Sequence, residues 1–242
     1  MTTQSIIFLH GWGMAGRLFD SLVDHRRGFS CIAPQLPGYP GSVWPAGLSF
    51  DQQLERMQQS FSSGHLVGWS LGGLYAIELA ARFSGQFSSL TLIASNPCFV
   101  KKAGWDCAIE EAVFDGFHDS LIEDWRPTLR RFLALQMQGE ADARQLTREI
   151  TREVLSMESP DLETLSTGLG LLKSVDARDK LSELEMPVKL ILGERDRLVP
   201  IELAQQIREV LPTIQVESVA GAGHAPFLSH SRQVAAMLPV EI

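Results

Sequence analysis

Short apolar runs that alternate with helix-like stretches are the feature that most constrains the fold of this chain. Most of the runs are continuously apolar, as expected for parallel strands that are covered on both faces. We expect strands at residues 5–9, 29–33, 65–68, 90–94, 188–192 and 215–219. We expect helices at residues 50–62, 71–83, 201–210 and 231–238. This rhythm predicts an α/β fold with a doubly wound, mainly parallel sheet. Ligands in such sheets bind outside the carboxyl ends of the strands.

The rhythm stops between about Phe99 and Ala177, where no convincing strand occurs. We expect helical segments there, around residues 115–118 and at 125–137, 141–155 and 161–172. Roughly 75 residues is far more than one crossover connection needs. We therefore predict a helical lid rather than ordinary crossover helices. Residues 1–98 and 177–242 would form the two parts of the core, and residues 99–176 the lid.

Composition excludes several classes of protein. A net charge of −8 over 242 residues argues against nucleic acid or an anionic membrane as a general partner. No apolar run approaches ~18 residues, so no membrane span is expected, and the first residues do not read as a signal peptide. The three cysteines lack metal-ligand spacing. We expect a cytoplasmic protein with reduced thiols and no bound metal.

The sequence Gly68-Trp-Ser-Leu-Gly72 lies between an apolar run and a helix-like run. The pattern G-x-S-x-G arises often by chance, and the alternative is a glycine-rich helix start with an inert serine. Strand, motif and helix in this order instead favour a nucleophile elbow, a sharp turn that exposes the serine hydroxyl. Glycine at 68 and 72 would let strand and helix approach closely. Ser70 is therefore the candidate nucleophile, with a helix N-terminus aimed at it.

A candidate base and a candidate acid follow the last two predicted strands. His224 comes after the small residues Ala220-Gly-Ala-Gly223, which allow a tight loop. Asp196 comes after the strand at 188–192 and before Val199-Pro200. Glu194 competes with Asp196 for the acid's role, and Asp176 and Asp179 are more distant competitors. The chain order of serine, acid and histidine matches that of the α/β-hydrolases.

The loop after the first strand reads His10-Gly-Trp-Gly-Met14. Its glycines allow backbone N–H groups to turn toward a ligand. We expect the N–H groups of Trp12 and Leu71 to form an oxyanion hole. His10 is expected to order this loop by hydrogen bonding and not to act as the base. The resulting mechanism, acyl transfer through Ser70, requires no metal and no organic cofactor.

Several motifs resemble those of one family of α/β-hydrolases, the biotin-pathway carboxylesterases that cleave pimeloyl-acyl-carrier-protein methyl ester and release methanol. The resemblance spans nearly the whole chain and rests on the segments 10–14, 36–38, 68–73, 95–99, 131–136 and 223–230. It implies an acyl-carrier protein with a methyl-pimeloyl group as partner. It also implies substrate contacts from Trp12, Ser70, Leu71, Phe132, Leu133, Ala134, Leu135, Gln136 and His224.

Two departures from this family stand out. The chain begins almost directly at the first predicted strand, so we expect the usual N-terminal antiparallel hairpin to be absent. Gln35 stands where many relatives carry Asp before Leu-Pro-Gly. Neither departure touches the predicted triad.

The predicted lid carries two groups of arginines. Arg144, Arg148 and Arg152 are spaced by four and share one helix face. The preceding segment contributes Arg126, Arg130 and Arg131. With the resemblance, this basic face predicts docking of an acidic carrier protein. The alternative is a solvated face relieved by Glu140 and Glu149. Similarly, Phe132 and Leu135 either form plain lid core or line an acyl tunnel.

Two other functions stay open at this point. One is a general short-chain carboxylesterase, thioesterase or C–C bond hydrolase with the same triad. The other is a non-catalytic ligand-binding module on this fold, which an intact triad argues against. We expect a monomer, and no membrane or nucleic-acid partner.

Overall fold

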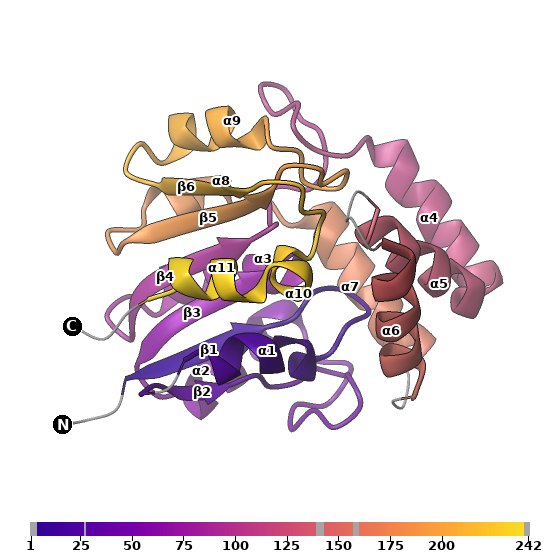
Figure 1. Cartoon of the computed structure of the whole chain (residues 1–242), viewed down its shortest axis with the longest axis horizontal. Helices are drawn as coiled ribbons and strands as arrows, with labels where there is room; N and C mark the ends of the chain where they lie inside the picture. Colours follow the sequence, from indigo (N-terminus) through magenta and orange to yellow (C-terminus); the bar gives the residue numbers. More distant parts are fainter. Residues whose placement is uncertain (1–3, 27, 139–142, 157–159, 240–242) are drawn as a thin grey trace.

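The computed structural model describes residues 4–26, 28–138, 143–156 and 160–239. Its strands form one sheet in the order β2-β1-β3-β4-β5-β6, and every neighbouring pair is parallel (Figure 1). The bounds are β1 Ser5–Leu9, β2 Ser30–Ile32, β3 Gly64–Trp69, β4 Phe87–Ile93, β5 Val188–Gly193 and β6 Gln215–Val219. The prediction of an α/β fold with a doubly wound sheet is confirmed.

The order of the strands places a crevice between β1 and β3. The chain runs from β1 outward to β2 and then returns past β1 to β3 on the other side. At such a switch point, the loops after the two adjacent strands, here β1 and β3, diverge and leave room for a ligand. These two loops carry Trp12 and Ser70.

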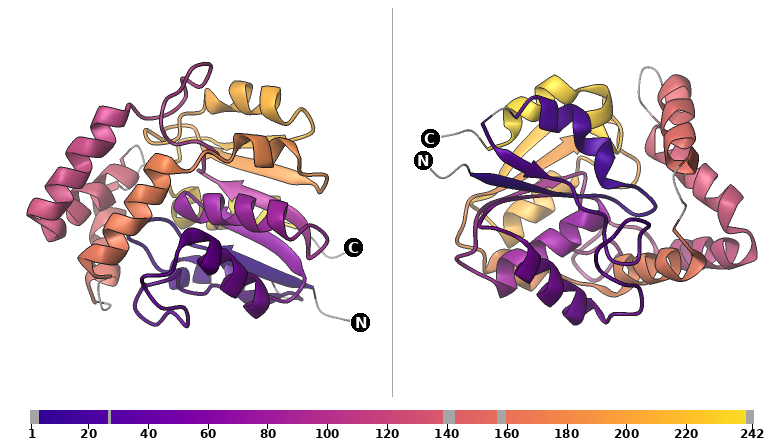
Figure 2. Two further views of the ribbon diagram at one scale, coloured as in Figure 1. Left: turned by 180° about the vertical axis from the view of Figure 1, so that it is seen from behind. Right: turned by 90° about the horizontal axis from the view of Figure 1, so that it is seen from below.

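Helices cover both faces of the sheet (Figures 1 and 2). On one face α3 (Leu71–Arg82) packs against β1, β3 and β4, with α2 (Phe50–Ser60) and α8 (Arg178–Ser182) beside it. On the other face α1 (Asp20–Asp24) contacts α11 (Ser231–Met237). The remaining core helices are η1 (Gly16–Phe19), α9 (Leu203–Val210) and α10 (Pro226–Ser229). None of the described helices combines the length and apolar composition needed to cross a membrane.

After β4 the chain runs through a loop over residues 94–110 that contains isolated β-bridges, and four helices then lie together at one end of the molecule (Figure 1). The helices are α4 (Glu111–Glu123), α5 (Trp125–Gln136), α6 (Ala143–Ser156) and α7 (Leu162–Ser174). We call them the insert. The expectation of a helix confined to residues 115–118 was too short, since α4 runs from 111 to 123. The division into a core and a lid at residues 98/99 and 176/177 stays a prediction.

Candidate active site

Ser70 occupies a strained turn between β3 and α3. Its backbone has φ +52° and ψ −118°, a region that costs a side-chain-bearing residue of order 1–3 kcal/mol. Its N–H donates to the carbonyl of Ile93 at 3.0 Å. Its carbonyl accepts from the Ser95 hydroxyl at 2.7 Å and from the Gly73 N–H at 2.9 Å. These hydrogen bonds hold the turn in its strained geometry.

The two glycines of the motif are required by close backbone approach. A Cβ on Gly68 would lie 2.4 Å from the carbonyl oxygen of Gly72. A Cβ on Gly72 would lie 2.1 Å from the carbonyl oxygen of Leu9. Any larger residue would force β3, α3 and β1 apart. The geometry is therefore that of the elbow that the sequence predicts.

Asp196 and His224 form a buried pair. The Asp196 Oδ2 accepts a hydrogen bond from Nδ1 of His224 at 2.8 Å, and the side chains are 0% and 1% exposed. The other carboxylate oxygen, Oδ1, accepts from the N–H groups of Leu198 at 2.8 Å and Val199 at 3.1 Å. Both oxygens of Asp196 are thus engaged, which fixes the carboxylate and leaves the lone pair of the neutral imidazole on Nε2.

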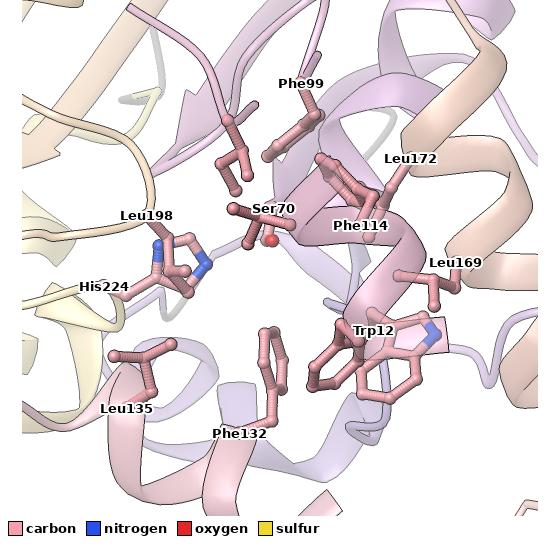
Figure 3. A pocket seen from close by; sticks show the side chains of 13 residues that line it. Trp12, Ser70, Phe99, Phe114, Phe132, Leu135, Leu169, Leu172, Leu198 and His224 are labelled. Atoms are coloured by element: carbon pink, nitrogen blue, oxygen red, sulfur yellow. The ribbon is translucent and has the colours of Figure 1, made fainter. Parts of the chain in front are cut away.

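His224 turns that second nitrogen toward Ser70. Nε2 is buried and has no hydrogen-bond partner among the described residues. The imidazole and the Ser70 hydroxyl line the same chamber (Figure 3). The backbone of His224 is held on both sides, because its N–H donates to the carbonyl of Gln136 at 3.2 Å and its carbonyl accepts from Nε1 of Trp69 at 2.9 Å. A loose serine–histidine contact is common without substrate.

The competing acids lie elsewhere. The exposed Glu194 accepts a hydrogen bond from the N–H of Gly221 at 2.9 Å. Asp176 forms ion pairs with Arg178 at 2.8 Å and Lys102 at 2.9 Å. The hydrogen bond from Arg178 holds the pKa of Asp176 well below its usual value. Asp179 is exposed on α8. Of these carboxylates, only Asp196 contacts His224.

His10 orders the loop that carries Trp12. Its Nδ1 donates to the carbonyl of Gly11 at 2.8 Å, and its Nε2 accepts from the N–H of Leu36 at 3.0 Å. Complete burial lowers the pKa of His10 to about 4, so the ring is neutral at pH 7. The next turn is fixed by Tyr39, whose hydroxyl accepts from the N–H of Gly13 at 2.9 Å. Both ring nitrogens of His10 are used by the backbone, as expected of a structural histidine.

The Trp12 loop lies directly against the elbow. A Cβ on Gly11 would be only 3.4 Å from the Cβ of Ser70 and 3.3 Å from the ring of Trp69. Leu71 is the first residue of α3, so its N–H has no acceptor within the helix. The two N–H groups predicted to form an oxyanion hole, those of Trp12 and Leu71, therefore belong to segments that meet at Ser70.

The chamber above Ser70 is apolar. It has a volume of about 100 Å³ and places Phe132 and Leu135 in its wall, as one of the two alternatives for these residues predicts. The rest of the wall, apart from Ser70 and His224, consists of Trp12, Phe99, Ile109, Val113, Phe114, Phe117, Leu169, Leu172 and Leu198. Except for Trp12, these residues were not identified from the sequence as part of the site. A signal was present, because the wall residues of α4 are spaced by three and four and those of α7 by three, which places each set on one helix face.

Three residues of the 132–136 segment lie outside this wall. Leu133 is fully buried in the core cluster. Ala134 is exposed and lines a second groove. Gln136 is buried and contacts the His224 loop through its backbone carbonyl. Substrate contact by these three side chains stays a prediction.

The second groove lies between α5 and α6. Its wall contains Arg131, Arg144 and Arg148, and Leu135 lines both this groove and the chamber. Arg126 instead packs over the ring of Trp125, with its Cζ 4.4 Å from the ring centroid. Arg130 and Arg152 are exposed and do not line the groove. Three of the six arginines of the predicted basic face therefore line this groove. Glu140 and the side chain of Glu149 lie outside the described residues.

Comparisons with known proteins agree with this geometry. The model of the alpha/beta hydrolase family matches residues 6–237. A pimeloyl-acyl-carrier-protein methyl ester esterase from Xylella fastidiosa is 34% identical over 97% of this chain and 93% of its own length. One from Aliivibrio salmonicida is 35% identical over 94% and 88%.

Solved structures show the same fold at lower identity. An esterase from Exiguobacterium antarcticum superposes with a TM-score of 0.85 at 20% identity, covering 97% of this chain and 90% of that one. A bromoperoxidase from Bacillus anthracis gives 0.81 at 20% identity, covering 98% and 90%. The chain belongs to the alpha/beta hydrolase family and, within it, to the family of pimeloyl-acyl-carrier-protein methyl ester esterases.

Proposed function

We propose that this protein is a serine carboxylesterase that hydrolyses pimeloyl-acyl-carrier-protein methyl ester to pimeloyl-acyl-carrier protein and methanol, in biotin biosynthesis. One observation carries the proposal. The buried pair of His224 and Asp196 faces Ser70 across an apolar chamber, in a chain whose full-length relatives bear this activity in their names.

Acylation uses the groups at the carboxyl ends of β1, β3, β5 and β6. Nε2 of His224 takes the proton of the Ser70 hydroxyl, and Oγ attacks the ester carbonyl carbon. The N–H groups of Trp12 and Leu71 stabilise the oxyanion, and one such donor contributes about 3 kcal/mol. Asp196 holds the imidazole tautomer and stabilises the imidazolium. His224 then protonates the departing methoxide, which leaves as methanol.

Deacylation repeats the sequence with water. His224 accepts a proton from water, the resulting hydroxide attacks the acyl-enzyme, and Ser70 regains its proton as the carboxylic acid forms. The chamber wall is hydrocarbon apart from Ser70 and His224. Burying an unpaired carboxylate there is costly, whereas a neutral methyl ester suits it. The chamber therefore retains the substrate and releases the ionised product.

The groove between α5 and α6 supports the carrier protein as partner. Three arginines gather at this groove, while the whole chain carries a net charge of −8. Leu135 lines both the groove and the chamber. A flexible acyl arm on an acidic carrier protein docked here would pass Leu135 to reach Ser70. We further propose a monomeric, cytoplasmic enzyme without a nucleic-acid or membrane partner.

Turnover of the carrier-linked methyl ester by purified protein tests the proposal. We expect hydrolysis with methanol release, and Ser70→Ala should lower kcat by roughly 10⁶. If Ser70→Ala retained most of the activity, the mechanism would be refuted. If the wild type showed no preference in kcat/KM for the carrier-linked ester over free short-chain esters, a general carboxylesterase would replace the proposed substrate.

A further inference from the structure

The indole of Trp12 is bound to a helix of the insert. Its Nε1 donates to the carbonyl of Leu165 on α7 at 2.7 Å, and both residues are buried. Phe117 and Phe132 contact the indole edge-on at ring-centroid distances of 5.5 and 5.0 Å. Figure 3 shows the ring beside Leu169 of the same α7. The ring is thus enclosed by the insert, while its backbone belongs to the loop after β1.

Gly168 lies on the same helix, three residues after Leu165. A Cβ at this position would lie 2.9 Å from Cδ1 of Trp12 and 3.3 Å from Cδ2 of Leu71. These are the two residues whose N–H groups are proposed to bind the oxyanion. Gly170, on the same helix, differs completely, because a Cβ there meets nothing within 4 Å. Glycine is therefore required at position 168 because the helix packs closely against Trp12 and Leu71 there, and not because of the helical backbone.

Helix α7 is fixed in place on both sides. Toward the core, the Thr164 hydroxyl donates to the carbonyl of Gly38 at 3.1 Å. Toward α4, His118 contacts the hydroxyl of Ser166 at 3.1 Å, and Lys173 forms an ion pair with Glu111 at 3.2 Å. The helix cannot retreat freely from an added methyl group. Strain at position 168 would therefore be transmitted to Trp12 and Leu71.

We propose that Gly168 is a positioning residue for the oxyanion hole, an inference that rests on the proposed function. The missing side chain lets α7 seat against Trp12 and Leu71, and the Leu165 carbonyl fixes the indole. The insert thereby sets where the two N–H groups point. Such donors act on charge that develops in the transition state, so a shift in their position lowers kcat and leaves KM unchanged.

Gly168→Ala and the matched control Gly170→Ala test this role. Both substitutions raise helix propensity equally, so they differ only in what the new methyl group meets. We expect Gly168→Ala to lower kcat for a short p-nitrophenyl ester roughly 10- to 100-fold, because small misplacements of catalytic groups have effects of this size. KM should stay the same. Gly170→Ala should match the wild type in both constants.

Inhibition by a trifluoromethyl ketone separates positioning from general loosening. Ser70 Oγ adds to the ketone carbonyl, His224 takes the serine proton, and the carbonyl oxygen becomes an oxyanion in the hole. We expect the inhibition constant of Gly168→Ala to rise by the same factor by which kcat/KM falls. If Gly168→Ala only loosened the chamber, KM would rise and the inhibition constant would not change in proportion to kcat/KM. That result would overturn the inference.

Trp12→Phe provides a second variant in case Gly168→Ala does not fold. It removes the N–H donor to Leu165 and keeps an aromatic ring, and we expect a smaller fall in kcat at constant KM. Wild-type kcat in either folded variant overturns the positioning role while leaving the esterase assignment intact. An inactive wild type would overturn the proposed function itself, so the two failures are distinguishable.

Discussion

Two regions with different chemistry form the chamber. One is the set of loops at the carboxyl ends of the strands, and the other is the insert above them. The loops supply every polar group that faces the chamber, Ser70 and His224, with Asp196 behind them. Each of these is held by short hydrogen bonds, several of them to the backbone. Helices α4, α5 and α7 supply hydrocarbon to the wall, and α5 and α6 carry arginines on the outside.

This difference separates two kinds of sensitivity. In the proposed mechanism, groups fixed by backbone geometry carry out the chemical step, so changes in the loops should alter kcat by orders of magnitude. In the proposed docking, exposed side chains on the insert select which ester reaches Ser70, so changes there should alter KM for selected substrates. Gly168 lies where the two regions touch, and is the exception on the insert side.

The largest effect is expected from Asp196→Asn. An amide in place of the carboxylate no longer fixes the imidazole tautomer, and kcat should fall by about 10⁴. Steady-state kinetics on a short p-nitrophenyl ester measures this fall. Glu194→Gln is the control, because the amide oxygen can still accept from the Gly221 N–H. Equal losses of kcat in both variants would contradict the conclusion that Asp196, and no other carboxylate, is the acid that orients His224.

The loop of His10 predicts an effect on stability. In the unfolded chain His10 has a pKa near 6.5, and in the folded protein burial lowers it to about 4. Between these two pH values the unfolded state binds more protons than the folded state. The free energy of unfolding therefore keeps its highest value, as far as His10 is concerned, above pH 6.5 and falls as the pH drops toward 4. The loss from this residue is on the order of 3 kcal/mol. Urea unfolding at several pH values measures it.

His10→Gln is the comparison for that measurement. The variant should be less stable at pH 7.5, and its stability should depend less on pH between 6.5 and 4. His65 contributes in the same direction, because burial lowers its pKa as well, and it is present in both proteins. Parallel pH curves for the wild type and His10→Gln would show that His10 is not the buried neutral group described above.

The core could be predicted from sequence because its signals are local. Strand β1 coincides with its predicted range, since a continuous apolar run marks a buried parallel strand. Strand β6 also coincides with its predicted range, although it is an edge strand with mostly exposed, largely polar residues. Strand β4 begins at Phe87, earlier than predicted, because Ser88 and Ser89 interrupt the apolar run while the backbone still pairs with β3. Ser70 was identified by its motif, and Asp196 and His224 by the loops that contain them. The three were expected to lie together because loops after parallel strands meet at one edge.

The insert could not be predicted in the same detail because its signals are tertiary. The apolar residues of α4 identify a buried face, but not which cavity that face lines. The short helices α1, α8 and α10 have at most five residues, too few for a periodicity. Gly168 reads as an ordinary helical glycine until Trp12 and Leu71 are seen beside it. Likewise, only the structure separates Arg131, Arg144 and Arg148 from the other arginines.

The smallest effect is expected from reversing those three charges. Arg131→Glu, Arg144→Glu and Arg148→Glu together should raise KM for the carrier-linked methyl ester about tenfold, because a repelled acidic partner docks more slowly. A short free ester should keep its kcat and KM, since the groove lies outside the chamber. Arg56→Glu, at an exposed position on α2 outside the groove, controls for the reversal of a single charge. High salt should weaken the effect of the triple variant. If the triple variant lost activity equally on both esters, the groove residues would affect the chemical step itself. The proposed division, in which the insert selects the substrate and the loops carry out the reaction, would then be wrong for α5.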